Sequence, residues 1–184
     1  VHMKRSFAFL CCLFILISLS GCSWFSWMKD KSMARGTPQG LYQQGSELYH
    51  KKKYEKAITI FQRLKDEYPL EDIASLAEIG IGDAHYSNKA YPEAYLAYDE
   101  FINRHPNDEN VPYALYQMGM CRYKMTDTID RDQTETWKAK ADLERLISQY
   151  PKSPFAVMGE KTLTEVKRKL AENEFYIGEF YFTQ

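Results

Sequence analysis

The chain has 184 residues, and its 24 lysines and arginines nearly balance its 25 aspartates and glutamates, giving a formal net charge of −1. This balance argues against the strongly basic class of nucleic-acid-binding proteins, because a phosphate backbone is bound mainly through clustered positive charge. The length suits one domain with its own hydrophobic core. No disulfide framework is expected, since Cys121 is the only cysteine beyond residue 22.

Residues 1–21 have the pattern of a bacterial lipoprotein signal peptide. Lys4 and Arg5 precede an apolar run over 7–19, which is too short to span a bilayer comfortably. The run ends in Leu19-Ser20-Gly21-Cys22, and small residues before a cysteine resemble a lipobox. We therefore expect cleavage before Cys22 and covalent attachment of diacylglycerol and an N-acyl chain to it. An ordinary signal peptide with an incidental cysteine is the alternative.

Residues 22–38 are expected to form a lipid-anchored tether, because they lack helical periodicity and end in Gly-Thr-Pro. Trp24, Phe25 and Trp27 suit a membrane–water interface, although exposed aromatic residues in a disordered linker are an equal alternative. Two or more acyl chains anchor a protein durably. Ser23, where an aspartate would favour the inner membrane, resembles outer-membrane lipoproteins. The expected location is the periplasmic face of the outer membrane in a Gram-negative bacterium.

Residues 39–184 repeat an amphipathic two-helix unit. Gly45, Gly82 and Gly119 are 37 residues apart (82−45 and 119−82). Each unit ends in a proline: Pro69, Pro106 and Pro151. An alanine lies twelve residues before each proline (Ala57, Ala94 and Ala139). A large apolar residue lies eight residues before it (Phe61, Tyr98 and Leu143). This is the tetratricopeptide (TPR) pattern, whose unit is about 34 residues. The sequence predicts an all-α TPR superhelix of stacked αα-hairpins with about three and a half repeats, at roughly 39–69, 75–106, 111–151 and, in part, 153–184.

The third and fourth units depart from this template. Gly119 to Pro151 spans 32 residues (151−119) instead of 24 (69−45), and the excess falls in an acidic turn at 126–133 that does not match a calcium-binding loop. Beyond Pro151 the insertion is close to four helical turns, so Ser153 and Pro154 are expected to cap and begin one long helix. The second helix of the fourth unit is lacking. Either the sequence is a fragment, or something else covers its last helix, which would leave the apolar side of 170–184 partly exposed.

Patterns for catalysis or metal binding are sparse. The sequence contains no HExxH, GxSxG or Walker motif, and its acidic residues fall on helix faces expected to be solvated. We therefore expect no enzymatic activity, no metal and no cofactor apart from the lipid on Cys22.

The inner face of the superhelix is the candidate binding surface. In TPR proteins the first helix of each repeat lines this face, and counting from each repeat glycine selects a mainly aromatic set that suits an extended apolar peptide. Tyr49, Tyr86 and Tyr123 occupy one position at 37-residue spacing (86−49 and 123−86), although such residues also serve simply as packing. The full set of candidates is Tyr42, Tyr49, Ile79, Asp83, Tyr86, Tyr116, Met120 and Tyr123.

Together these features resemble the BamD (ComL) family of TPR lipoproteins of the outer-membrane β-barrel assembly (BAM) machinery. The resemblance is carried by the LSGC lipobox, the Tyr-Pro repeat endings, the Asp130-Arg131-Asp132-Gln133 run in the enlarged turn and the closing LAENEFYIGEFYF at 170–182. It implies a non-enzymatic protein that binds unfolded outer-membrane proteins, including their aromatic C-terminal signal, and aids their insertion with BamA and the other lipoproteins of the complex.

The resemblance also implies more chain than is present here. Family members continue through the rest of the fourth repeat and a fifth, the region that contacts BamA. The alternative is another periplasmic TPR lipoprotein, such as a secretin pilotin or a cell-envelope coordination scaffold.

Overall fold

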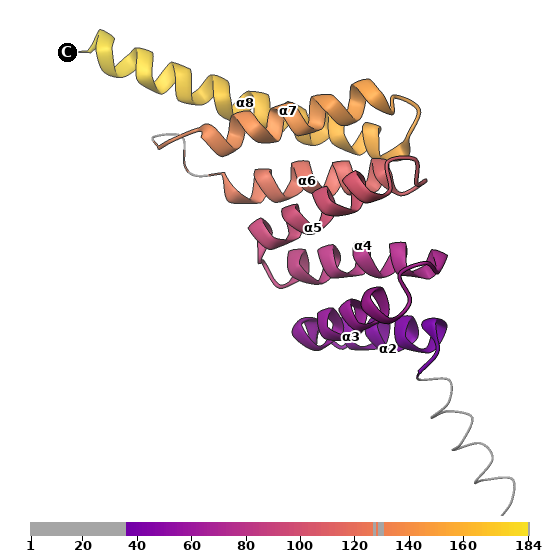
Figure 1. The fold of residues 1–184 in the computed structure, drawn as a ribbon. Helices are drawn as coiled ribbons and strands as arrows, with labels where there is room; N and C mark the ends of the chain where they lie inside the picture. Colours follow the sequence, from indigo (N-terminus) through magenta and orange to yellow (C-terminus); the bar gives the residue numbers. More distant parts are fainter. Residues whose placement is uncertain (1–35, 127, 129–130, 184) are drawn as a thin grey trace, which may run out of the picture.

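The computed structural model describes residues 36–126, 128 and 131–183, and in these ranges all regular secondary structure is helical (Figure 1). The predicted signal peptide, Cys22 and the aromatic tether residues lie outside the described residues. The helices are α2 (Pro38–His50), α3 (Tyr54–Glu67), α4 (Asp72–Ser87), α5 (Tyr91–Arg104), α6 (Val111–Met125), α7 (Thr134–Gln149) and α8 (Pro154–Phe182). The predicted all-α class and the pairing of helices into hairpins are confirmed.

The helices stack as successive layers from α2 and α3 to α7 and α8 (Figure 1). Each hairpin is closed by a contact between the repeat glycine and the large apolar residue of the second helix. A β-carbon added at Gly45 would lie 2.5 Å from Phe61, and one added at Gly119 would lie 2.7 Å from Leu143. The glycine is thus required because it lets the two helices approach closely.

Phe61 shows how neighbouring repeats are joined. Its ring is held between Gly45 of α2 and Gly80 of α4, where an added β-carbon would lie 2.8 Å away. The ring is only 3% exposed and belongs to a core cluster with Leu41, Leu64 and Ala77. Because Phe61 packs on its own repeat and on the next, it joins the first hairpin to the second.

The enlarged third turn separates α6 from α7 where the sequence predicted it. Gln133 organises the turn: its Nε2 donates to the carbonyl oxygens of Thr128 and Arg131, and its Oε1 accepts from the Thr136 hydroxyl. Asp132 accepts from the Thr134 backbone N–H and hydroxyl, which holds the pKa of Asp132 below its usual value. Among the described residues no group of three or more potential metal ligands occurs.

Helix α8 is the long helix that the sequence predicted. The Ser153 hydroxyl accepts from the Phe155 backbone N–H, and Pro154 occupies the first turn. Its buried side is lined by Ala156, Gly159, Leu163, Val166 and Leu170. Met158 is 48% exposed, and the close approach of α7 is made at the next residue, Gly159, where Leu146 packs.

Beyond Leu170, α8 projects past the end of α7 (Figure 1). Its large apolar side chains there are exposed, from 42% at Ile177 to 92% at Phe182. The expected uncovered apolar surface at the end of the chain is therefore present. No helix within the described ranges has the length and apolar character needed to cross a membrane.

Candidate peptide-binding face

The first helices of the hairpins and the start of α8 lie in sequence along one side of the stack. A Tyr49 hydroxyl contact with Ser87 Oγ at 2.9 Å joins α2 to α4. The Tyr113 hydroxyl joins α6 to α4 through Asp83, and the Thr162 hydroxyl of α8 contacts Met120 Sδ of α6 at 3.6 Å. This series of contacts defines the inner face.

The three tyrosines of the predicted ladder are each half-buried on this face. The Tyr49 ring packs against Tyr54 at a centroid distance of 5.6 Å, and the Tyr86 ring packs against Tyr91 at 5.4 Å. Burial raises the pKa of Tyr86 to about 12, with further contributions from Cys121, Tyr91 and Tyr116. Each ring therefore contributes to packing while keeping part of its surface accessible.

Three other candidates are also partly exposed. Tyr42 packs against Phe61 at 5.8 Å between ring centroids, and Tyr116 packs against Phe155 of α8 at 6.2 Å. Met120 contacts Thr162, as described above, and stays half-exposed. These side chains extend the aromatic surface along the inner face.

Ile79 and Asp83 differ from the other candidates. Ile79 is 8% exposed and lies in the central core cluster, so it offers almost no surface to a ligand. Asp83 Oδ1 accepts from the Tyr98 and Tyr113 hydroxyls, each at 2.6 Å. Burial raises the pKa of Asp83, while the two hydrogen bonds oppose that shift. Both residues thus join repeats two and three from within.

A hollow of about 560 Å³ lies where the inner face meets α8. It is lined by Tyr123 and Thr126 at the end of α6, by Thr128, and by Glu165, Arg168, Lys169 and Glu172 of α8. The repeat pattern predicts Tyr123 at this face but not its polar neighbours, because α8 departs from the repeat template.

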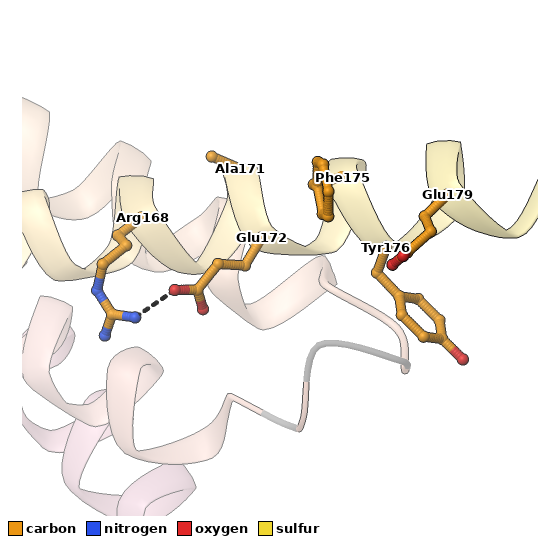
Figure 2. Close-up of a pocket in the computed structure, with 6 residues that line it drawn as sticks. All are labelled: Arg168, Ala171, Glu172, Phe175, Tyr176 and Glu179. Carbon is orange, nitrogen blue, oxygen red and sulfur yellow. Dashed lines mark hydrogen bonds and ion pairs between the residues drawn. The ribbon is translucent and has the colours of Figure 1, made fainter. Parts of the chain in front are cut away.

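A second, apolar hollow of about 370 Å³ continues along the projecting part of α8. Figure 2 shows its lining residues, with Arg168 and Glu172 directed to the same side of the helix, where they form an ion pair. Ala171, Phe175, Tyr176 and Glu179 complete the lining. The two hollows share Arg168 and Glu172 and are therefore adjacent.

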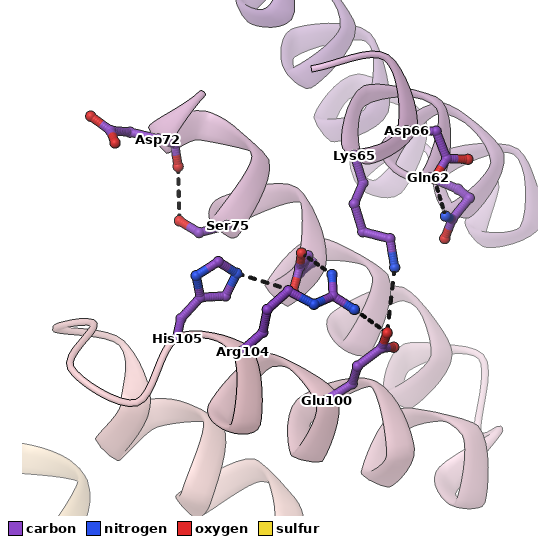
Figure 3. A network of polar contacts seen from close by, with 9 residues as sticks. Gln62, Lys65, Asp66, Asp72, Ser75, Glu100, Arg104 and His105 are labelled. Carbon is purple, nitrogen blue, oxygen red and sulfur yellow. Dashed lines mark hydrogen bonds and ion pairs between the residues drawn. The ribbon is translucent and has the colours of Figure 1, made fainter. Parts of the chain in front are cut away.

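A charge network centred on the buried Glu78 joins α3, α4 and α5, and the sequence patterns did not predict it. Glu78 of α4 is 7% exposed and pairs with Arg104 Nη1 of α5 at 2.5 Å. Arg104 also pairs with Glu100, which in turn lies 3.8 Å from Lys65 of α3 (Figure 3). His105 Nε2 lies 3.4 Å from Glu78 Oε2. The sequence contains a sign of this network, because Glu78 stands where the flanking repeats have leucine. Leu41 and Leu115 occupy the equivalent position (78−41 and 115−78 are both 37).

Cys121 is fully buried, and burial raises its pKa to about 12. A thiol in this state is a poor nucleophile at neutral pH, because the thiolate is the reactive form. Among the described residues it is the only cysteine, and it contributes to the central core cluster.

Comparison with solved structures shows the same fold in TPR domains. The first TPR domain of Spaghetti (RPAP3), solved with an HSP90 peptide, matches 73% of this chain and 93% of that domain, with a TM-score of 0.56 and 18% identity. The TPR domain of Arabidopsis OM64 matches 72% of this chain and 98% of that domain, with a TM-score of 0.54 and 14% identity. These similarities establish the fold.

Comparison with known sequences is more specific. Outer membrane protein assembly factor BamD of Rickettsia prowazekii is 29% identical over 169 residues, covering 92% of this chain and 66% of the relative. BamD of Caulobacter vibrioides is 27% identical over 141 residues, covering 77% and 46%. The chain thus spans between about half and two thirds of the length of these relatives. The family model YfiO, described as outer membrane lipoprotein, matches residues 34–184. Because this match covers most of the sequence, the chain belongs to the YfiO family of outer membrane lipoproteins.

Proposed function

We propose that the chain is a non-enzymatic lipoprotein of the β-barrel assembly machinery at the periplasmic face of the outer membrane. In this role its inner face binds unfolded outer-membrane proteins and aids their insertion, together with BamA and the other lipoproteins of the complex. The observation that carries the proposal is the YfiO family match over 34–184, joined by relatives named as outer membrane protein assembly factors.

The inner face supports the binding part of the proposal. Tyr49, Tyr86 and Tyr123 are spaced at equal sequence intervals and keep part of their surface accessible, so an extended chain with apolar side chains can contact several of them at once. Tyrosine offers a large contact area with few torsions to immobilise. An unfolded β-barrel strand, in which apolar residues alternate with polar ones, has the complementary chemistry.

The test is recovery of partners from the membrane. The full chain, expressed with a C-terminal affinity tag in a Gram-negative host and purified from detergent-solubilised envelope, is expected to bring down BamA, identified by mass spectrometry. Recovery of a secretin without BamA would contradict the proposal and favour the pilotin alternative.

Membrane attachment is tested separately through Cys22. The natural chain should incorporate labelled palmitate and fractionate with the outer membrane, because more than one acyl chain gives durable anchoring. Cys22→Ser should incorporate none. Cys121→Ser is the matched control, since Cys121 is buried in the core, and it should retain the label. Palmitate incorporation into Cys22→Ser would show that the lipid is elsewhere.

A further inference from the structure

We propose that a basic edge of the first two repeats binds anionic phospholipid headgroups and so orients the stack of helices on the membrane. This basic edge consists of four exposed lysines in the α2–α3 turn, the start of α3 and the α4–α5 turn: Lys52, Lys53, Lys56 and Lys89. The inference rests on the proposed membrane attachment through Cys22 and goes beyond it, because it states which part of the fold faces the lipid.

The two turns that carry the basic edge lie side by side. Figure 1 shows both on one side of the stack, with the start of α2 on the opposite side. Asn88 Nδ2 of the α4–α5 turn donates to Glu55 Oε1 near the start of α3 at 2.7 Å. The contact between the Tyr49 hydroxyl and Ser87 Oγ joins the ends of α2 and α4. The lysines of the two turns therefore form one surface.

Two of these lysines occupy a backbone conformation that favours glycine. Lys52 and Lys89 stand at equivalent positions of the two turns (89−52 is 37), and their φ angles are 57° and 63°. This left-handed region is costly for a residue with a β-carbon. Glycine would satisfy both turns more easily, so the fold alone does not select lysine at this position.

The charge of the basic edge is not neutralised within the described ranges. None of its four lysines forms an ion pair with a carboxylate there, whereas the neighbouring Lys51 pairs with Glu47 at 3.6 Å. The Glu55 carboxylate accepts from the amide of Asn88 instead. The basic edge thus presents local positive charge, although the net charge of the chain is only −1.

Acidic residues lie on the other parts of the stack that could face a membrane. Glu71 and Glu109 are exposed in the connections on the opposite edge. The third turn, between α6 and α7, has Asp127, Asp130 and Asp132 in its sequence. An anionic surface attracts the basic edge and repels these acidic parts, so it orients a chain that has little net charge.

The proposed anchor allows the basic edge to reach the lipid. Gly36, which accepts from the Tyr68 hydroxyl, lies on the edge opposite the lysines. From Cys22 to Gly36 is 14 residues (36−22), with a maximum reach of about 46 Å at about 3.3 Å per residue. Helix α2 has 13 residues and is about 20 Å long. Because the reach exceeds this length, attachment through Cys22 keeps the lysines within range of the headgroups, and lipid is the partner that it supplies.

The test measures how close each edge lies to the lipid. The full lipidated chain carries a donor dye on Lys51→Cys, in the α2–α3 turn, or on Leu70→Cys, which is 97% exposed on the opposite edge. It is bound to phosphatidylcholine vesicles whose headgroups carry an acceptor dye, and the buried Cys121 does not compete for the donor. Adding phosphatidylglycerol should raise energy transfer from position 51 and not from position 70. Salt at about 0.5 M should remove this increase, because it screens the charges.

Charge reversal identifies the lysines that make the contact. Each lysine near an anionic surface contributes about five-fold to the docking equilibrium, so Lys52→Glu with Lys53→Glu should weaken docking about 25-fold or more and abolish the increase. Lys152→Glu with Lys161→Glu is the matched control, because it makes the same change of charge at exposed lysines outside the basic edge, and it should keep the increase. Lys53→Glu with Lys56→Glu repeats the test without altering the left-handed residue, and circular dichroism checks that each variant is folded.

The other outcomes overturn the inference in distinguishable ways. If phosphatidylglycerol changes neither signal or raises both equally, the basic edge does not orient the chain, although attachment through Cys22 stands. If the increase survives charge reversal or high salt, another surface contacts the lipid. If phosphatidylglycerol has no effect and the charge-reversed chain loses a protein partner during purification from the envelope, the basic edge binds protein. If the chain leaves every vesicle, so that neither label transfers energy, the proposed membrane attachment is refuted together with the inference.

Discussion

The ring of Tyr98 in α5 lies directly against Gly82 in α4, so that a β-carbon on Gly82 would approach the ring carbon Cε1 to 2.6 Å. The ring cannot move aside easily, because it is fully buried and its hydroxyl donates to Asp83. Gly82→Ala should therefore lower the free energy of unfolding by about 1–3 kcal/mol, the usual cost of overpacking. Urea denaturation followed by circular dichroism measures this change.

Gly178→Ala is the control for helix propensity. An added β-carbon there meets nothing within 4 Å, and alanine favours a helix over glycine by up to about 1 kcal/mol. This variant should be as stable as the natural chain or slightly more so. Equal effects of the two substitutions would show that close packing at Gly82 is not what requires glycine.

The repeat architecture was predictable because the contacts that build it are local and periodic. The glycine and the large apolar residue that touch in the structure, such as Gly45 and Phe61, were recognised as separate marks at fixed offsets. The start of α8 was also predictable, since Ser153 and Pro154 are strong local signals. Which side of each helix is buried, in contrast, depends on tertiary contacts with the neighbouring helices.

The site was less predictable for the same reason. Ile79 and Asp83 were assigned to the inner face by counting, but neighbouring helices bury the first and supply two hydroxyl donors to the second. Lys169 could not be placed beside Tyr123 without the course of α8, which breaks the 37-residue period. Counting residues along the sequence shows which residues occupy equivalent positions in successive repeats. It does not show their contacts, because these depend on the side chains of the neighbouring repeat.

Glu78 occupies a core position that repeats one and three fill with leucine, and this suggests a stabilising substitution. Leu41 and Leu115 are 0% and 1% exposed at the equivalent positions. Replacing a buried ion pair by a well-packed apolar side chain is often neutral or stabilising by about 1–4 kcal/mol. Glu78→Leu should therefore maintain or raise the free energy of unfolding, because Arg104 is 41% exposed and keeps Glu100 as a partner.

The reverse change tests the same network. Arg104→Leu removes the main partner of Glu78 and leaves the buried carboxylate with only His105 nearby, so it should lower the free energy of unfolding by about 1–3 kcal/mol. Urea denaturation of both variants at pH 7 provides the measurement. A large loss of stability in Glu78→Leu, similar to that in Arg104→Leu, would mean that the network is essential rather than tolerated.

Asp83 makes stability depend on pH with a defined sign. Burial raises the pKa of this carboxyl group above its unfolded value. Its contribution is therefore fully present below the unfolded pKa, about 3.9, and is lost as the pH rises through the folded pKa. Asp83→Asn does not titrate, so its stability relative to the natural chain should increase as the pH is raised from 4 toward 7.

Asp132→Asn is the matched control of opposite sign. The pKa of Asp132 is lowered by its hydrogen bonds from Thr134, so its contribution is present above the unfolded pKa and is lost only as the pH falls below it. The stability difference between this variant and the natural chain should be nearly constant between pH 5 and pH 7. Urea unfolding at several pH values measures both differences, and parallel behaviour of the two variants would contradict the assignment.

The tyrosine ladder makes a prediction that separates binding from packing. Tyr49, Tyr86 and Tyr123 are half-buried, so replacing each by alanine should cost less stability than the roughly 3–5 kcal/mol typical of a fully buried aromatic residue. If the exposed part of each ring contacts a peptide, each truncation should also weaken peptide binding by about 1–2 kcal/mol, roughly five- to thirty-fold in Kd. Tyr49→Phe should retain the fold, because it removes only the hydroxyl contact with Ser87.

Tyr68→Ala provides the control for lost packing, because Tyr68 is also half-buried but caps the end of a second helix, α3, away from the ladder. Its hydroxyl donates to the Gly36 carbonyl oxygen at 2.6 Å, so its truncation should lower stability without changing peptide affinity. Thermal unfolding and fluorescence anisotropy with a peptide of alternating apolar and polar residues that ends in phenylalanine are measured for all four alanine variants at a temperature where each is folded. Weaker binding in at least two ladder variants, with unchanged binding in Tyr68→Ala, is the expected result. If all four lose stability and bind the peptide as the natural chain does, the ladder serves the core alone and the ligand contacts another surface.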